Sequence, residues 1–110
     1  MAPSPTPANS REELHEILVE INGNRNVYFQ PPESLKMVYP AIVYARDYGQ
    51  TQFASNLPYR YMNRYQVTVI DRNPDSLTPK KVAMLPMCSF SRHFASDELN
   101  HDVFSLYYKE

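Results

Sequence analysis

Side chains near the end of the chain alternate between two faces over a long stretch, and this constrains the fold more than any other feature. Residues 88–94 and 103–108 both repeat with a period of two, and the polar segment 95–102 lies between them. Successive side chains of a β-strand point to opposite faces of a sheet, so this period predicts strands that present one face to a core. We therefore expect a C-terminal hairpin closed by a loop at residues 95–102.

An amphipathic helix is predicted at about residues 11–22. Ser10 and Glu13 have the spacing of a capping box, and Gly23 can end the helix with a left-handed residue. Four apolar residues repeat at helical spacing on one face and should pack on the sheet. These residues are Leu14, Ile17, Leu18 and Ile21.

The rest of the chain predicts an α+β fold. Strands are expected at residues 27–29, 41–44 and 59–70, the last of them central or near-central in the sheet, and a short helix at about residues 79–85. The order helix, strand, strand, strand, helix, strand, strand favours a largely antiparallel sheet of four or five strands, with both helices packed on one face. The length suffices for a single domain, which we place at residues 10–110.

The first nine residues are expected to lie outside this domain. Pro3, Pro5 and Pro7 alternate with small residues, which removes backbone donors and favours an extended, polyproline-like arm. We predict that residues 1–9 are disordered unless a partner binds them.

Composition excludes several classes of function. The formal charge of −1 and pI near 6.3 provide no overall field for nucleic acid, so a dedicated DNA-binding module is disfavoured. The chain has a single cysteine and only two glycines, which rules out an intrachain disulfide and a glycine-rich nucleotide loop. No apolar run reaches the roughly 18 residues of a membrane span, so we expect a protein made in the cytoplasm, with no membrane contact and no cofactor.

Two catalytic arrangements can be written from the residues, and each has a simpler structural explanation. Cys88 with His93 or His101 would be a nucleophile and base, but Cys88 starts an apolar strand and suits packing. Asp71, Asp75 and Lys80 (or Lys81) would suit a small metal-dependent nuclease, although Asp71 and Asp75 frame a turn sequence. The histidines have no metal-ligand spacing, so we expect no enzymatic activity and keep the nuclease as the alternative.

The segment between the second and third predicted strands is much longer than a tight turn requires. Residues 45–58 separate them, and loops longer than about 12 residues are usually functional or disordered. Tyrosines and arginines gather in this segment and at the start of the strand that follows it, and both are favoured at protein interfaces. They could also contact single-stranded nucleic acid. The candidate interface residues are Arg46, Tyr48, Phe53, Tyr59, Arg60, Tyr61 and Arg64.

Charge is unevenly distributed along the sequence. Four glutamates outweigh Arg11 in the predicted first helix, whereas arginines outnumber aspartates at residues 46–72. Unlike surfaces of this kind suit head-to-tail contacts between copies of one chain, although solvated faces also explain them.

Four strand and turn motifs together resemble a family of phage proteins. They are Y-P-A-I-V-Y at residues 39–44, Y-Q-V-T-V-I-D at 65–71 with the following N-P-D-S turn, C-S-F at 88–90 and L-N-H-D-V-F at 99–104. Over roughly residues 10–109 the chain is similar to the tail terminator, or tail completion, proteins of phages with long non-contractile tails. The resemblance rests on strand and turn patterns and carries over no catalytic residue.

The resemblance implies a structural role in the virion. A tail terminator forms a ring, usually hexameric, on the head-proximal end of the tail tube, stops tube growth and receives the filled head. Its partners are copies of itself, the tail-tube protein and the head-closure or connector proteins, and phage DNA passes through the ring. A head-closure or adaptor protein of the neck is the nearest alternative. A small metal-dependent nuclease or nucleic-acid-binding protein is the alternative of a different class.

Overall fold

The computed structural model describes the backbone of residues 10–54 and 57–109, and the side chains of residues 11–47 and 63–108. The predicted proline-rich arm, residues 1–9, lies outside this part. Two helices and five strands follow in the order expected from the sequence, and the α+β fold class is confirmed. The elements are α1 (Ser10–Asn22), β1 (Val27–Phe29), β2 (Ala41–Ala54), β3 (Leu57–Asp71), α2 (Thr78–Ala83), β4 (Cys88–Ser96) and β5 (Leu99–Lys109).

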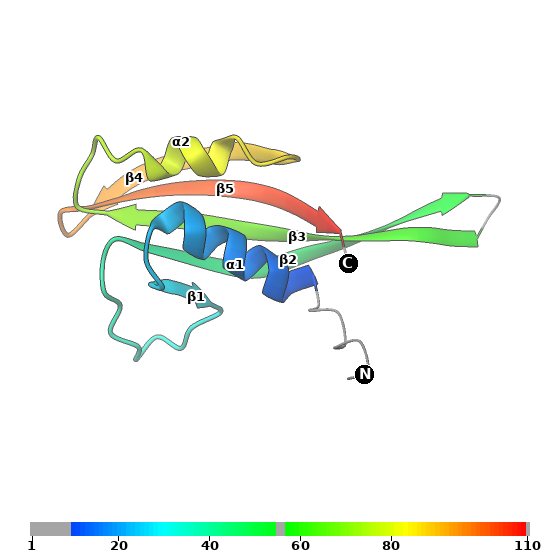
Figure 1. The fold of residues 1–110 in the computed structure, drawn as a ribbon, viewed down its shortest axis with the longest axis horizontal. Coiled ribbons are helices and arrows are strands. Elements are labelled where there is room, and N and C mark those ends of the chain that lie inside the picture. Colours follow the sequence, from blue (N-terminus) through cyan, green and yellow to red (C-terminus); the bar gives the residue numbers. More distant parts are fainter. Residues whose placement is uncertain (1–9, 55–56, 110) are drawn as a thin grey trace, which may run out of the picture.

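The strands form one sheet in the order β1-β2-β3-β5-β4 (Figure 1). β3 lies in the centre, as its alternating sequence predicts. Three strand pairs are antiparallel, but β1 runs parallel to β2, so the sheet is mixed rather than purely antiparallel. The parallel pair is short, and residues 30–40 carry the chain back to the start of β2.

Both helices pack on the same face of this sheet. Leu14 and Leu18 of α1 are completely buried, and Val82 is the buried residue of α2. Ile21 packs at the margin of the core, whereas Ile17 is half-buried and borders the outer side of the helix. The sheet contributes the rest of the core, namely Val27, Ile42, Tyr44, Tyr65, Val67, Val69, Phe104 and Leu106.

The ends of the helices agree only partly with the sequence signals. α1 ends at Asn22 and is followed by Gly23, whose φ of +81° is the left-handed conformation that glycine adopts easily. α2 is shorter than expected, because it begins at Thr78 and ends at Ala83. Leu77 occupies its N-cap position without a side-chain hydrogen bond. Proline in the first turn is therefore the sequence signal that marks the start of α2.

The predicted C-terminal loop is wrong. β4 and β5 continue through residues 95–102 and are joined by a turn at Asp97 and Glu98. Both turn residues have positive φ, 53° and 64°, which is the geometry of a tight hairpin turn. Glycine or asparagine normally signals such a turn in a sequence. Asp97-Glu98 contains neither residue, so the turn was not predicted.

The expectation that the hairpin presents one face to the core holds for β5 and fails for most of β4. Phe104 and Leu106 of β5 are buried. Phe90 and Phe94 of β4 remain 58% and 40% exposed, because β4 is the outermost strand of the sheet.

The predicted long loop at residues 45–58 is also wrong. β2 continues to Ala54 and β3 begins at Leu57, so the two strands form one long hairpin (Figure 1). The register shifts twice, between Arg46 and Tyr48 and between Gln52 and Phe53. Asp47 of β2 is the extra residue at the first shift, and Tyr59 of β3 is the extra residue at the second. A β-bulge breaks the period of two, so the bulge at Asp47 hides the alternation of β2.

Candidate functional site

The most distinctive feature of the fold is a two-stranded arm, which we define as residues 50–54 of β2 and 57–61 of β3. β1 pairs with β2 only at residues 42–44, and β5 pairs with β3 only from Met62 onward. Within the described chain, the strands of the arm therefore pair with each other alone. Figure 1 shows the arm extending well beyond the rest of the sheet. A two-stranded ribbon is only marginally stable by itself in water.

The predicted interface residues gather on this arm and at its base. Backbone register places Thr51 opposite Tyr61 and Gln52 opposite Arg60, while Phe53 lies opposite Pro58. Tyr59 lies between Arg60 and Pro58 on β3. The side chains of these residues, and that of Tyr48, lie outside the described set. The remaining two candidates, Arg46 and Arg64, are at the base of the arm and can be described in full.

Arg64 forms an ion pair at the base of the arm. Its Nε–H donates to Asp47 Oδ1 over 2.9 Å, and each side chain is 35% exposed. The hydrogen bond to Asp47, followed by a weaker one to Tyr107 of β5, raises the pKa of the Arg64 guanidinium. Arg64 thus links β3 to both neighbouring strands.

Arg46 lies over an aromatic cluster beneath the start of α1. Its guanidinium carbon is 5.9 Å from the centre of the Tyr65 ring, and Tyr65 packs against Tyr44 with 5.9 Å between ring centroids. On the other side, Arg11 lies 4.7 Å from the ring of Phe29, which contacts Tyr44 in turn. Each arginine therefore packs on an aromatic ring at the edge of the core.

A polar pair inside this cluster was not evident from the sequence. His15 Nδ1 lies 2.7 Å from the Tyr44 hydroxyl, although 29 residues separate them. Burial lowers the pKa of His15 and raises the pKa of Tyr44, which favours the neutral form of each group. A histidine on a helix and a tyrosine on a distant strand form no motif, and only the packing of α1 on β2 brings them together.

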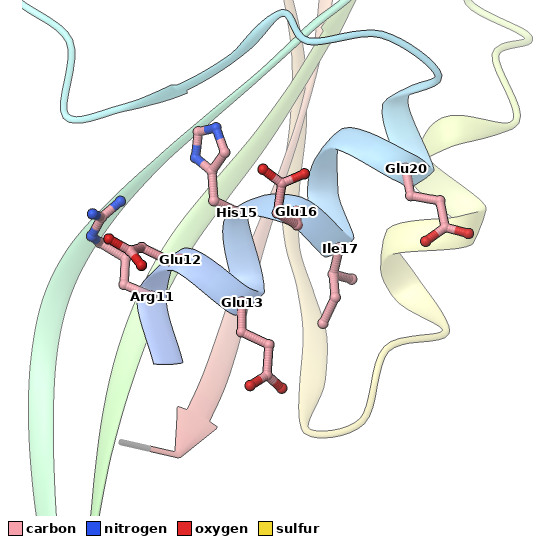
Figure 2. A pocket seen from close by; sticks show the side chains of 7 residues that line it. All are labelled: Arg11, Glu12, Glu13, His15, Glu16, Ile17 and Glu20. Atoms are coloured by element: carbon pink, nitrogen blue, oxygen red, sulfur yellow. The ribbon is translucent and has the colours of Figure 1, made fainter. Parts of the chain in front are cut away.

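The outer side of α1 forms an open acidic hollow (Figure 2). Glu16 pairs with Arg25 over 2.9 Å at the surface, which lowers the pKa of Glu16. Glu13 accepts a hydrogen bond of 2.7 Å from the hydroxyl of Tyr108. The hollow is lined entirely by one helix, so it is a charged surface rather than an enclosed pocket. Its residues are Arg11, Glu12, Glu13, His15, Glu16, Ile17 and Glu20.

The acidic residues of the alternative nuclease site take part in turn formation. Asp71 Oδ1 accepts the N–H of Asn73 over 3.0 Å, and Asn73 Oδ1 accepts the N–H of Asp75 over the same distance. Such bonds are typical of Asx turns. Among the described residues, no group of three or more His, Cys, Asp or Glu side chains is placed to hold a metal ion.

The thiol and imidazole groups of β4 and β5 are likewise separated. Cys88 lies opposite Leu106, and burial raises the pKa of its thiol, which disfavours the nucleophilic thiolate. His93 instead bonds to Asp102 over 2.9 Å. His101 stacks on Phe94, with 4.5 Å between the ring centroids.

Comparison of the chain with known protein families found no match, and comparison with curated protein sequences found none either. No helix in the described residues is long and apolar enough to cross a membrane. The arm, the distribution of charge and the edges of the sheet are therefore the features that bear on function.

Proposed function

We propose that this chain is a structural subunit of a homo-oligomeric ring in the neck of a tailed phage. The ring would cap the head-proximal end of the tail tube and join it to the filled head. The observation that carries the proposal is the arm, because its strands extend beyond the sheet that would otherwise stabilise them. A small subunit that assembles can stabilise such a ribbon against a neighbour.

Charge supports contacts between unlike surfaces of successive copies. Residues 46–64, the arm and its base, carry three arginines and one aspartate, whereas α1 carries four glutamates and one arginine. Contacts between two different patches repeat head to tail and close into a ring when the rotation between copies permits. Opposite charges favour such a contact over pairing of like patches.

The resemblance to tail terminators supplies the rest of the proposal. It implies six copies per ring, with the tail-tube protein on one side and head-closure or connector proteins on the other. Phage DNA would pass through the lumen of the ring, within the assembled virion. No step in this role requires a catalytic residue or a cofactor. Head closure or a neck adaptor would use the same ring architecture.

Reversing one charge in the arm tests the proposal. Arg60→Glu should weaken self-association of the purified chain and joining of heads to tails, because it places a carboxylate in the basic surface. Lys80→Glu, the same charge change on the exposed side of α2, is the matched control. Light scattering would give the mass of the assembly, and electron microscopy would count joined virions.

Deletion of the gene should give filled heads separate from tails. Normal joined virions from the deletion would contradict the proposal. So would a metal-dependent nuclease activity of the chain that is lost in Asp71→Ala, which would favour the enzymatic alternative instead.

A further inference from the structure

The sheet has one long open edge, formed by β4. β4 is the outermost strand and, among the described strands, pairs only with β5, over residues 88–96. Alternate residues of a paired strand direct their N–H and C=O groups away from the partner. The backbone hydrogen bonds outside the ladders include none from residues 89–96, so these outward groups have no backbone partner in the described chain.

This edge lacks most of the features that protect sheets from further pairing. Such features are proline, lysine, a very short strand or a covering segment. β4 has nine residues without proline or lysine, and its single bulge lies between Phe90 and Arg92. The opposite edge contrasts with it, because β1 has three residues and is followed by Pro31 and Pro32. β1 is therefore protected from further pairing, and β4 is open to it.

Apolar side chains are exposed on β4 and just before it, whereas the nearby carboxylates lie in its turn and on β5. Phe90 and Phe94 are substantially exposed on β4, as is Met87 just before it. Residues 88–102 carry one arginine against three carboxylates, those of Asp97, Glu98 and Asp102. The arm and its base carry the opposite balance, with three arginines against one aspartate.

We propose that β4 of one copy receives a strand of the arm of the next copy as an additional strand of its sheet. The inference rests on the proposed ring and identifies the contact that would build it. The arm is the right shape of donor, since its strands have unpaired outer edges along residues 50–54 and 57–61. Strand addition satisfies both sets of backbone groups, and the opposite charges favour this pairing over β4 with β4.

The acidic surface of α1 is a weaker candidate for the same arm. A helix bonds its backbone groups internally and offers none to an unpaired strand. Each subunit would thus give one arm and receive one, which is a heterologous contact that can close into a ring. The five-stranded sheet would then continue from one subunit into the next.

One backbone N–H can be removed to test the edge. In a hairpin with a two-residue turn, the flanking residues Ser96 and Leu99 form a hydrogen-bonded pair, so Ala95 directs its N–H away from β5. Ala95→Pro removes this outward donor at a position where an edge strand tolerates proline. Ala95→Ser keeps the donor and is the matched control.

The donor side has its own variant. Replacing residues 51–61 by Asn-Gly joins Gln50 to Met62, which are opposite each other, through a two-residue turn and removes the arm. Each variant should keep a cooperative urea transition. We expect Ala95→Pro and the shortened chain each to raise the dissociation constant for self-association at least about tenfold. Ala95→Ser should assemble like the natural chain.

Mixing the two variants gives the most decisive result. The shortened chain has an intact β4, and the Ala95→Pro chain has an intact arm, so together they should form one-to-one heterodimers and nothing larger. Native mass spectrometry would show them directly. Strand addition would be overturned if the two variants stayed monomeric when mixed, or if Ala95→Pro alone formed full-sized rings. Neither result would contradict the proposed ring. A natural chain that stays monomeric at high concentration would overturn both proposals.

Discussion

Arg64 on β3 donates its Nε–H to Asp47 on β2 over 2.9 Å at the base of the arm. Asp47 lies at a bulge, where the register shifts between Arg46 and Tyr48. A bulge bends its strand and increases the local twist. The ion pair therefore connects the two strands at the place where the direction of the arm is set.

Asp47→Asn should change the arm without changing the stability of the domain. Asparagine keeps an acceptor oxygen but loses the charge, and a pair that is one-third exposed contributes little to unfolding. We expect an unaltered urea midpoint and faster hydrogen exchange at residues 50–54. Glu16→Gln removes another exposed pair, far from the arm, and should leave exchange there unchanged. Identical exchange in both variants would show that Asp47 does not position the arm.

The stripe of α1 that packs on the sheet can be tested with two neighbouring residues. Leu18 is completely buried, so Leu18→Ala should destabilise the domain by about 2 to 5 kcal/mol. Ile17 is half-buried at the outer hollow, and Ile17→Ala should cost clearly less. Urea unfolding of both variants provides the comparison. Equal losses would mean that the core extends around the helix further than the structure shows.

The parts of the fold that sequence could predict are those governed by local pattern. α1 follows from its apolar stripe and from Gly23, and β3 follows from uninterrupted alternation through Tyr65, Val67 and Val69. Each pattern reports burial of a regular element, which tertiary packing reinforces. The same pattern wrongly predicted that Ile17 packs fully on the sheet. A helical stripe predicts which face of the helix is buried but not where the buried face ends.

Composition indicated where the candidate site lies in the sequence. It did not predict that the site is a pair of long strands. The bulge of β2 at Asp47 breaks the alternation of residues 45–54, and long-range pairing with β3 forms the strand despite it. The Arg64–Asp47 pair and the His15–Tyr44 pair depend on contacts across the sheet, which have no signature in a single sequence. Exposure of β4 depends on its place at the edge, and that is set by the topology of the whole sheet.

The turn between β4 and β5 should be improved by glycine. Glu98 has a φ of 64°, which is unfavourable for a residue with a side chain. Glu98→Gly relieves this strain at some entropic cost in the unfolded chain, so we expect a gain of about 0.5 to 1 kcal/mol in unfolding free energy. Glu98→Ala removes the carboxylate but keeps the strain, and it should show no such gain. A comparable gain from alanine would assign the effect to charge instead.

The bond between Tyr108 and Glu13 should make stability depend on pH in the alkaline range. Burial, then the hydrogen bond to the Glu13 carboxylate, raises the pKa of Tyr108 to about 12 from an ordinary value of 10.0. Below pH 10 the hydroxyl is protonated in both the folded and unfolded chain, so the bond contributes fully. Between about pH 10 and 12 the unfolded chain loses this proton first, and the contribution falls as pH rises.

The difference in stability between the natural chain and Tyr108→Phe should therefore shrink across that range in urea unfolding. Glu13→Gln keeps an acceptor without the charge, and absorbance titration of its tyrosines should show Tyr108 ionising at lower pH than in the natural chain. A stability difference that stays constant up to pH 12 would show that the bond to Glu13 does not stabilise the protonated hydroxyl of Tyr108.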